Sequence, residues 1–316
     1  MNRHFKTFLL VLGASLLIGG SAIFAASCKY VKSLGKTREF DLTGQTIKNF
    51  EFDCDTSNIK FVATTDSTMK VVYQETDKIF HTEEVKENTL FIKQVDDIKW
   101  YERAFTFDWA PKKATIYLPA GHYENLKVDN DTGELEIPHD FSFDAVNIKL
   151  STGDVSFNSD VTEEIKIETS TGDISLSDIT TKSLSAKRST GNLTMKNINV
   201  TEGIVLECNT GKTTVNSTKA QSLMIKASTG EVKLNDVKVV GELNIKTSTG
   251  DVEFDDIDFG SGRIETSTGD VEGTLSTPKY IDADTHTGKN KVDSDRTIAQ
   301  ELVVRSDTGD IVIKNK

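Results

Sequence analysis

The stretch IETSTGDISLSD, residues 167–178, reads as a strand, a tight corner and a second strand. Thr171, Gly172 and Asp173 form the corner, and apolar residues alternate on both sides of it. Similar phrases recur through the second half of the chain. The glycines of its ten Thr–Gly pairs are Gly133, Gly153, Gly172, Gly191, Gly211, Gly230, Gly250, Gly269, Gly288 and Gly309. Spacings of 19–21 residues between them indicate one structural unit that is stacked ten times.

Aligning the ten units on their glycine predicts the role of each position. The residues five before the glycine, and two and four after it, are mostly aliphatic. This alternation is the period of a β-strand, and the glycine supplies a corner that excludes a Cβ atom. The acidic or amide residues near Asp178, Asn197, Asp236 and Asp256 predict a second corner. Each unit should therefore contain two strands and two corners.

One such unit cannot bury its apolar face alone, but stacked units form a continuous narrow core. The sequence therefore predicts an all-β fold, a β-solenoid of two-strand coils about 4.8 Å apart, with an N-terminal β cap. We divide the chain into three parts. They are 1–40, a cytoplasmic stub, membrane anchor or signal segment and basic neck; 41–130, the β cap and first irregular coils; and 131–316, the solenoid of ten Thr–Gly repeats.

The segment FEFDCDTSNIKFV, residues 50–62, resembles a coil without its glycine. Ser57 and Asn58 stand where a glycine and an acid would be expected. Cys54 lies three residues before this corner, and Cys208 has the same offset in its own unit. We expect both cysteines to be small buried side chains, several coils apart and too distant for a disulfide.

The charge of the chain limits its partners. Residues 1–40 carry six Lys or Arg and one acid, so the remainder has a formal net charge of −17. Such an acidic body argues against nucleic acid, whose binding depends on cations that contact phosphates. Anionic lipid would attract only the basic neck.

The N-terminal segment predicts contact with a membrane. An uncharged run from Thr7 to Cys28 follows a short basic start and is long enough to cross a bilayer. Three interpretations stay open: an uncleaved signal anchor with one transmembrane helix, a secretory signal cut after Ala26 or Ser27, or a lipoprotein signal with lipid on Cys28. The length favours the anchor, whereas the flanking charges do not fix the orientation.

Two groups of side chains are candidate binding surfaces. The first is an acidic edge beside the corner glycines, formed by Asp154, Asp173, Asp251, Asp270 and Asp310. The second is an aromatic patch in the cap, formed by Trp100, Tyr101, Phe105, Phe107 and Trp109. Corner chemistry explains the acids, and a cap core explains the aromatic residues, without any ligand. The five histidines are scattered singly, and we expect no catalytic residue, metal or cofactor.

The repeated STGDV and STGDI corners at Gly153, Gly172, Gly250 and Gly269 resemble the bacterial putative-adhesin, β-strand-repeat family called domain of unknown function 4097. The entry ATIYLPAGHYENLKVDNDTGELEI into the repeats resembles it too, and the likeness covers about residues 41–316. It implies an extracytoplasmic β-solenoid, often behind one membrane segment, linked to adhesion or envelope stress. It offers no site residues, because fold does not supply function.

Two functions are therefore compared. The first is a structural or binding module at the cell envelope, held in the cell membrane by a single pass and contacting envelope components or partner proteins. The second is a polysaccharide-acting enzyme that uses carboxylates on one face of the solenoid. Such enzymes need irregular clefts and long loops, whereas these units vary in length by one or two residues. The sequence favours the binding module and no enzymatic activity.

Overall fold

The computed structural model describes residues 35–100 and 112–316, and the elements bounded there are 25 strands. Strands β1 to β7 are Lys36–Asp41, Asn49–Cys54, Ser57–Thr64, Lys70–Glu75, Ile79–Lys86, Thr89–Asp96 and Lys112–Pro119. Strands β8 to β16 are Gly121–Thr132, Leu135–Ile137, Phe141–Thr152, Val155–Phe157, Asp160–Thr171, Ile174–Thr181, Ser183–Thr190, Leu193–Val200 and Gly203–Thr210. Strands β17 to β25 are Thr213–Ala220, Ser222–Thr229, Val232–Thr249, Val252–Thr268, Val271–Leu275, Tyr280–Thr287, Asn290–Val292, Glu301–Thr308 and Ile311–Asn315.

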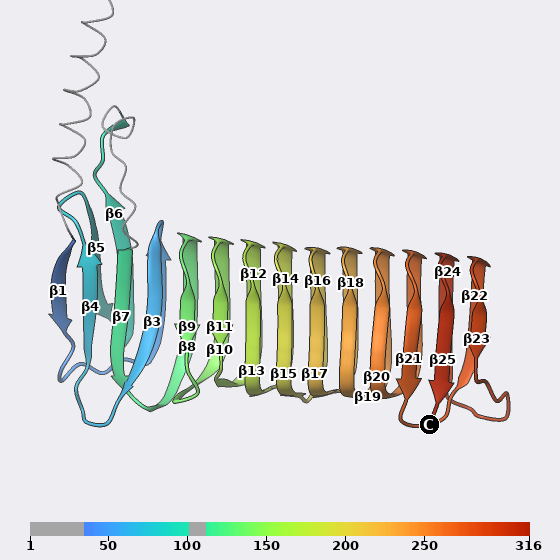
Figure 1. Cartoon of the computed structure of the whole chain (residues 1–316). Coiled ribbons are helices and arrows are strands. Elements are labelled where there is room, and N and C mark those ends of the chain that lie inside the picture. The colour runs from blue at the N-terminus through green and yellow to red at the C-terminus, as the bar shows by residue number, and fades with distance from the viewer. Residues whose placement is uncertain (1–34, 101–111) are drawn as a thin grey trace, which may run out of the picture.

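These strands form a straight β-solenoid with a cap at its N-terminal end (Figure 1). Every coil pairs in parallel with the next one, so that equivalent residues lie opposite each other. Ile167 in β12 lies opposite Ala186 in β14, and Leu176 in β13 lies opposite Met195 in β15. The predicted all-β solenoid is thus confirmed.

No membrane-spanning helix is found within residues 35–100 and 112–316. The predicted transmembrane or signal segment, including Cys28, lies outside the described residues. Strand β1 begins at Lys36 and pairs antiparallel with β4, so the cap sheet includes the last residues that the sequence assigned to the neck.

The corner glycines have the backbone that the repeat predicted. Gly172 has a φ of 136°, a region that other residues rarely adopt. A Cβ atom on Gly172 would lie 2.1 Å from the carbonyl oxygen of Gly153 in the preceding coil. Only glycine therefore permits the close stacking of successive corners.

The second corner is also present, and it uses left-handed residues other than glycine. Asp178, Asn197, Asp236 and Asp256 have φ values of 50–57°, and Ser217 joins them at 45°. Asp and Asn tolerate this conformation because their side chains bond locally. The prediction of two corners was incomplete, since a third bend closes each coil. Its hydrogen bonds join the bends of successive coils, for example from the Glu202 N–H to the Lys182 carbonyl.

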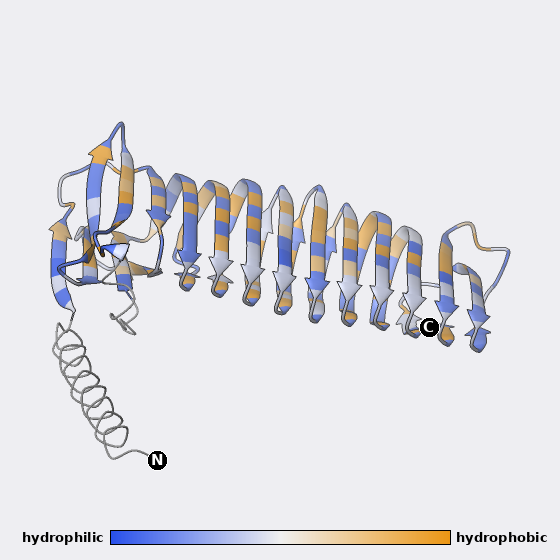
Figure 2. Cartoon of the chain, turned by 90° about the horizontal axis from the view of Figure 1, so that it is seen from above, coloured by the Kyte–Doolittle hydropathy of each residue, from blue (hydrophilic) through white to orange (hydrophobic). Residues whose placement is uncertain are grey.

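The core is a narrow apolar column that runs through all coils. Figure 2 shows apolar and polar bands alternating along the strands of the rod. Ile167, Leu176 and Ile225 are fully buried at the inward positions that the repeat predicted. Gly273 replaces one large inward residue, and the ring of Phe254 from the neighbouring coil fills that space.

The coils at both ends are not stacked in sequence order. At the N-terminal end, β2 and β3 lie between β6–β7 and β8–β9. At the C-terminal end, β24 and β25 lie between β20–β21 and β22–β23 (Figure 1). The last segment of the chain is therefore inserted into the solenoid, and β22–β23 form its terminal coil.

The register of charged residues favours this C-terminal insertion. Arg305 in β24 lies opposite Glu265 on one side and opposite Asp284 on the other. Stacking in sequence order would place the carboxylates of Glu265 and Asp284 directly opposite each other, which is destabilising in a sheet. Arg305 also forms an ion pair with Asp282 and donates a 2.7 Å hydrogen bond to its carbonyl oxygen.

Candidate functional site

The acidic edge lies beside the corner glycines, and its five aspartates have clear hydrogen-bonding roles. The backbone N–H of Asp173 donates to Asp154 Oδ1 at 2.7 Å, and that of Asn192 donates to Asp173 Oδ1 at 2.6 Å. The same bond joins Asp270 to Asp251 at 2.9 Å and Asp310 to Asp270 at 2.7 Å. In each pair, one carboxylate oxygen of the aspartate thus accepts a hydrogen bond from the backbone of the adjacent coil.

Tertiary structure alters the composition of this edge. Insertion of β24 and β25 places Asp310 directly beside Asp270, although Lys289 lies between them in sequence. The Lys289 N–H then donates to Asp310 Oδ1 at 2.7 Å at the end of the row. Asp251, Asp270 and Asp310 therefore form an uninterrupted run. Within the described ranges, no group of three potential ligands has a metal-binding arrangement.

Longer side chains interrupt the row in the middle of the solenoid. Lys212 pairs with Glu231 in the next coil, with Nζ 2.8 and 2.9 Å from the two carboxylate oxygens. This ion pair separates Asp173 and Asn192 from the run that begins at Asp251. The edge is therefore two short acidic segments that flank a neutralised section.

The predicted aromatic patch is only partly within the described structure. Trp100 is 84% exposed, whereas Tyr101, Phe105, Phe107 and Trp109 lie outside the described residues. A different aromatic cluster fills the core where the cap meets the solenoid. Its members are Phe50, Phe52, Phe61, Tyr123, Phe141 and Phe143. Phe50 and Phe61 pack edge to face with centroids 5.4 Å apart, a favourable aromatic geometry.

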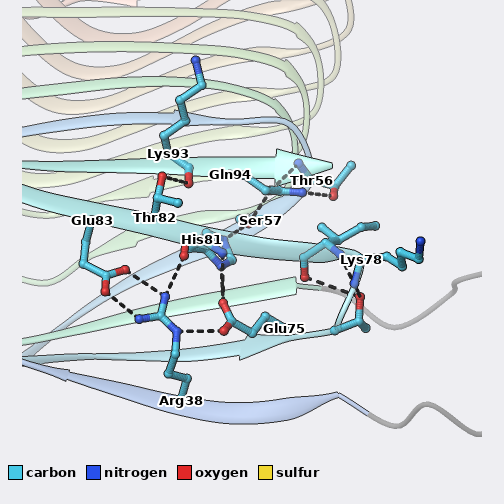
Figure 3. A network of polar contacts seen from close by, with 12 residues as sticks. Arg38, Thr56, Ser57, Glu75, Lys78, His81, Thr82, Glu83, Lys93 and Gln94 are labelled. Carbon is cyan, nitrogen blue, oxygen red and sulfur yellow. Dashed lines mark hydrogen bonds and ion pairs between the residues drawn. The ribbon is translucent and has the colours of Figure 1, made fainter. Parts of the chain in front are cut away.

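A largely buried polar network, which we call the end plug, closes the N-terminal end of the core. Figure 3 shows Arg38, Ser57, Glu75, His81, Glu83 and Gln94, and Tyr73 packs beside them. Arg38 Nη1 and Nη2 contact the two Glu83 oxygens at 2.6 and 2.8 Å, and Nε donates to Glu75 Oε1 at 2.8 Å. Because Arg38, Glu75 and Glu83 come from β1, β4 and β5, the guanidinium joins the strands that end the two walls of the solenoid.

His81 lies at the centre of the end plug. Its Nε2 is 2.7 Å from Ser57 Oγ, and its Nδ1 is 3.4 Å from Glu75 Oε2. Its ring stacks on Tyr73 at 4.7 Å, and the Arg38 guanidinium lies 4.5 Å from the centroid of the same Tyr73 ring. The Ser57 hydroxyl donates to Gln94 Oε1 at 2.7 Å, so its oxygen can act only as the acceptor of a hydrogen bond from His81 Nε2–H.

Burial and hydrogen bonding together set the protonation of His81 and Glu75 in the end plug. Burial lowers the pKa of His81, against the opposing effect of Glu75, and favours the neutral ring. Burial disfavours ionisation of Glu75, but hydrogen bonds from Arg38 and His81 outweigh it and lower the pKa of this carboxyl. The hydrogen bonds that Arg38 donates to the Glu83 carboxylate raise the pKa of Arg38. The native plug therefore holds a neutral histidine between a carboxylate and a hydroxyl.

The order Ser57, His81 and Glu75 is that of a catalytic triad, but its environment is that of a structural contact. Ser57 is fully buried, and its only hydroxyl proton is donated to Gln94. A nucleophile must reach the substrate carbonyl, which a buried corner residue cannot do without opening the cap. The arrangement therefore holds the cap on the first coils.

A second buried charge lies inside the solenoid. Arg188 is 1% exposed and has the same inward offset as Cys208, which lies opposite it in the next coil. Nη1 donates to the carbonyl oxygens of Gly191 and Thr210, and Nη2 donates to that of Lys212 at 2.9 Å. Burial lowers its pKa. Backbone carbonyls rather than a carboxylate thus hold this guanidinium.

The two cysteines behave as the sequence predicts. Cys54 and Cys208 are both buried and free. Burial raises the pKa of the Cys54 thiol to about 12, which keeps it protonated at neutral pH. Ser57 and Asn58 also occupy the predicted corner, since Asn58 Oδ1 accepts a hydrogen bond from the Glu134 N–H at 3.1 Å.

Together these features define a parallel β-solenoid with repeated polar corners and a sealed N-terminal end. The chain belongs to the Toastrack DUF4097 family, whose model matches residues 47–314. The resemblance of the repeated corners to this family is thus confirmed. No curated protein matches the chain.

Three solved structures are similar to this chain. One is a putative cell adhesion protein from Clostridium sporogenes, with 11% identity, a TM-score of 0.25 and coverage of 89% of this chain and 100% of that one. The second is a putative adhesin from Bacteroides fragilis, with 14% identity, a TM-score of 0.40 and coverage of 89% and 97%. The third is a putative adhesin from Parabacteroides distasonis, with 12% identity, a TM-score of 0.38 and coverage of 86% and 97%.

Proposed function

We propose that the protein is a membrane-held, extracytoplasmic rod that acts as a binding and structural module of the cell envelope, without enzymatic activity. The observation that carries this proposal is the repetition of one exposed corner along the rod. Thr171 lies opposite Thr190, which lies opposite Thr210, and the adjoining Ser170 and Asp173 are exposed as well. Regularly spaced polar groups favour a partner that makes many weak contacts at once.

The acidic segments of this edge define the charge of the proposed partner. Asp251, Asp270 and Asp310 each keep one carboxylate oxygen free of the inter-coil hydrogen bond. We propose that these segments, with Asp154 and Asp173, bind cationic or polar envelope components. Such exposed contacts should weaken as salt increases, because they are screened beyond about 8–10 Å.

The test replaces Asp154, Asp173, Asp251, Asp270 and Asp310 together with asparagine and measures retention on isolated envelopes at low and high salt. Asparagine keeps an oxygen acceptor for the next coil, so the fold should survive. We expect the wild-type protein to be retained at low salt and the variant to lose most of that retention. A matched control changes five exposed aspartates away from the edge: Asp129, Asp140, Asp160, Asp178 and Asp293. Equal retention of both variants would reject the acidic edge as the binding surface.

Membrane attachment is a separate part of the proposal, and the apolar run that ends at Cys28 supports it. Cell fractionation of the full chain and of a chain lacking residues 1–34 tests the attachment. We expect only the full chain to sediment with membranes and to be digested by protease added outside the cell. Recovery of both chains in the soluble fraction would contradict it. A role in the response to envelope stress, which the family resemblance suggests, would need a changed stress response in cells that lack the protein.

A further inference from the structure

A hollow of about 420 Å³ lies on the side of the solenoid just beyond the second corner. It spans three coils and is formed by β15, β17 and β19. Its lining residues are Asn197, Ile198, Asn199, Ser217, Lys219, Asp236 and Lys238. The hollow lies away from the corner glycines and their acidic edge, so the surface already described does not include it.

Two lysines lie directly opposite each other in this hollow. Lys219 in β17 is the register partner of Lys238 in β19, and both are exposed. Like charges in this position destabilise a sheet. Neither ammonium group forms an ion pair with any residue in the described ranges. An unrelieved repulsion of this kind disappears when an anion binds between the two groups.

Two other lysines in the coils that form the hollow are paired with acids. Lys212 contacts Glu231 at 2.8 Å, and Lys233 contacts Glu253 at 2.6 Å. The carboxylate in register with Lys238 is Asp258, which lies opposite it in the next coil. The buried Lys279 already holds Asp258 at 2.7 Å. Lys279 thus occupies the carboxylate that faces Lys238, and Lys238 forms no ion pair within residues 35–100 and 112–316.

The neighbouring side chains add a donor and set the charge balance. Asn199 is exposed and lies opposite Lys219, so its amide N–H groups extend the row of donors. Asp236 is the one carboxylate that lines the hollow. Two lysines against one aspartate leave a local excess of one positive charge, on a body whose net charge is −17. The local charge of the hollow is thus opposite in sign to the net charge of the solenoid.

We propose that this hollow is a binding site for phosphate groups, in which Lys219 and Lys238 contact one phosphate and Asn199 donates a hydrogen bond to it. Coils stand about 4.8 Å apart, so ammonium groups on adjacent coils can reach the same tetrahedral anion. Lysine binds phosphate as a mobile point charge, which suits an open hollow. The phosphate can belong to an envelope polymer or be free in solution.

The experiment measures the affinity of the full-length protein for a short polyphosphate and for inorganic phosphate by calorimetry, at constant ionic strength. We expect the double variant Lys219→Gln/Lys238→Gln to lose about tenfold or more in affinity for polyphosphate. Asn199→Ala should weaken binding less, and Asp236→Asn should strengthen it because it removes the opposing charge. Tighter binding of polyphosphate than of inorganic phosphate would indicate a polymeric source, and equal affinity per phosphate would indicate free phosphate.

The matched control is Lys226→Gln/Lys246→Gln. These two exposed lysines also lie opposite each other in adjacent coils, but each pairs with an acid, Glu207 at 3.8 Å and Glu265 at 3.5 Å. The control removes the same charge and should keep wild-type affinity. Equal losses in both double variants would show general charge attraction and overturn the site. Undetectable binding of both probes by a wild-type protein with an intact thermal melt would overturn it too, as would stronger binding of citrate than of polyphosphate.

Discussion

Glu265 and Arg305 lie opposite each other in adjacent coils, although the residues of another complete coil separate them in the sequence. That intervening coil, β22–β23, stacks on the far side of Arg305 and places Asp284 against it. In register, one cation thus lies between two acidic residues that would otherwise be opposite each other. The C-terminal segment therefore acts as an internal layer of the solenoid, and its removal should affect more than its own residues.

We expect a chain ending at Gln300, which lacks β24 and β25, to lose the ordered coil 280–292 as well. The removed strands carry four fully buried side chains, Leu302, Val304, Ile311 and Ile313. Without them, this coil would lose the apolar surface on which it packs. Limited proteolysis with mass spectrometry should show cleavage within 276–300 that is about tenfold faster or more, because the free energy of local unfolding is then lower.

A chain ending at Ser276 is the matched control, because it removes both terminal coils together. Its remaining coils should melt close to the wild-type temperature, since each coil contacts only its neighbours. Unchanged protection of 276–300 in the chain ending at Gln300 would mean that β22–β23 can stack directly on β20–β21. The charge explanation for the insertion would then be wrong.

Substitution of a corner glycine should destabilise the middle of the rod. Gly172→Val, Gly250→Val or the milder Gly172→Ala places a Cβ atom about 2.1 Å from the carbonyl oxygen of the preceding corner. We expect a loss of about 2–4 kcal/mol in the free energy of unfolding, from backbone strain and overpacking together. Urea denaturation measures it. Gly203→Ala is the control, because its φ is not positive and its nearest neighbour is the movable Ser222 hydroxyl. Equal effects at Gly172 and Gly203 would contradict the corner assignment.

The corner aspartates should stabilise the stack through hydrogen bonding more than through charge. Asp173 Oδ1 accepts the Asn192 N–H at 2.6 Å, and asparagine offers an equivalent oxygen. Asp173→Asn should therefore change the free energy of unfolding little, whereas Asp173→Ala should cost about 0.5–1.5 kcal/mol. Thermal melts of the two variants decide between these roles. A large loss with asparagine would show that the negative charge itself is needed there.

The buried guanidinium should be sensitive to the shape of its replacement. Arg188→Lys keeps a buried charge but cannot reach the carbonyls of Gly191, Thr210 and Lys212 together, and should cost about 3–5 kcal/mol. Arg188→Thr removes the charge and resembles Thr169 and Thr247, which occupy the same inward offset in other coils. We expect threonine to be the less damaging replacement in urea denaturation. The reverse order would show that the charge is favourable inside the core.

Acid should loosen the end plug. The folded protein lowers the pKa of His81 below its ordinary value of 6.5, so this group's contribution is complete above pH 6.5 and falls as the pH drops below it. The pKa of Glu75 is also lowered, from 4.5, so its contribution is lost as the pH falls below 4.5. Stability should therefore decrease in two steps on acidification. His81→Gln should abolish the first step, and the exposed His122→Gln should leave it unchanged. A pH profile that His81→Gln does not alter would rule out this origin.

Much of the fold could be predicted from the repeat because the constraints are local. Gly172 excludes a Cβ atom, Ile167 and Leu176 alternate with polar neighbours, and each coil experiences nearly the same surroundings. The second corner at Asp178 was predicted for the same reason. The third bend was missed because its residues follow no repeated motif: Lys182 has no glycine beside it, whereas Gly203 follows Glu202 and Gly241 forms the bend of a later coil.

The end plug and the buried Arg188 could not be predicted in this way. Arg38, Glu75 and His81 belong to three strands outside the repeat, and only the antiparallel pairing of β1, β4 and β5–β6 brings them together. Arg188 stands at an inward offset that the other coils fill with uncharged residues such as Thr169, Cys208 and Ala227, so the offset did not indicate how a charged side chain would be accommodated there. Its burial depends on carbonyls from the neighbouring coil.

The sequence by itself determined the coil. The Thr–Gly corner and the alternation of apolar and polar residues both act within about 20 residues, and both recur along the repeats. Tertiary structure alone decided the order in which the end coils stack. Coils with the same apolar pattern can pack on one another in several orders, because burial does not distinguish between them. The choice comes from side chains that meet only after stacking, as where Arg305 separates Glu265 from Asp284. Tertiary structure likewise placed Lys219 opposite Lys238 and bound Asp258 to Lys279, so that neither of the two facing lysines has an ion pair in the part of the chain that the structure describes.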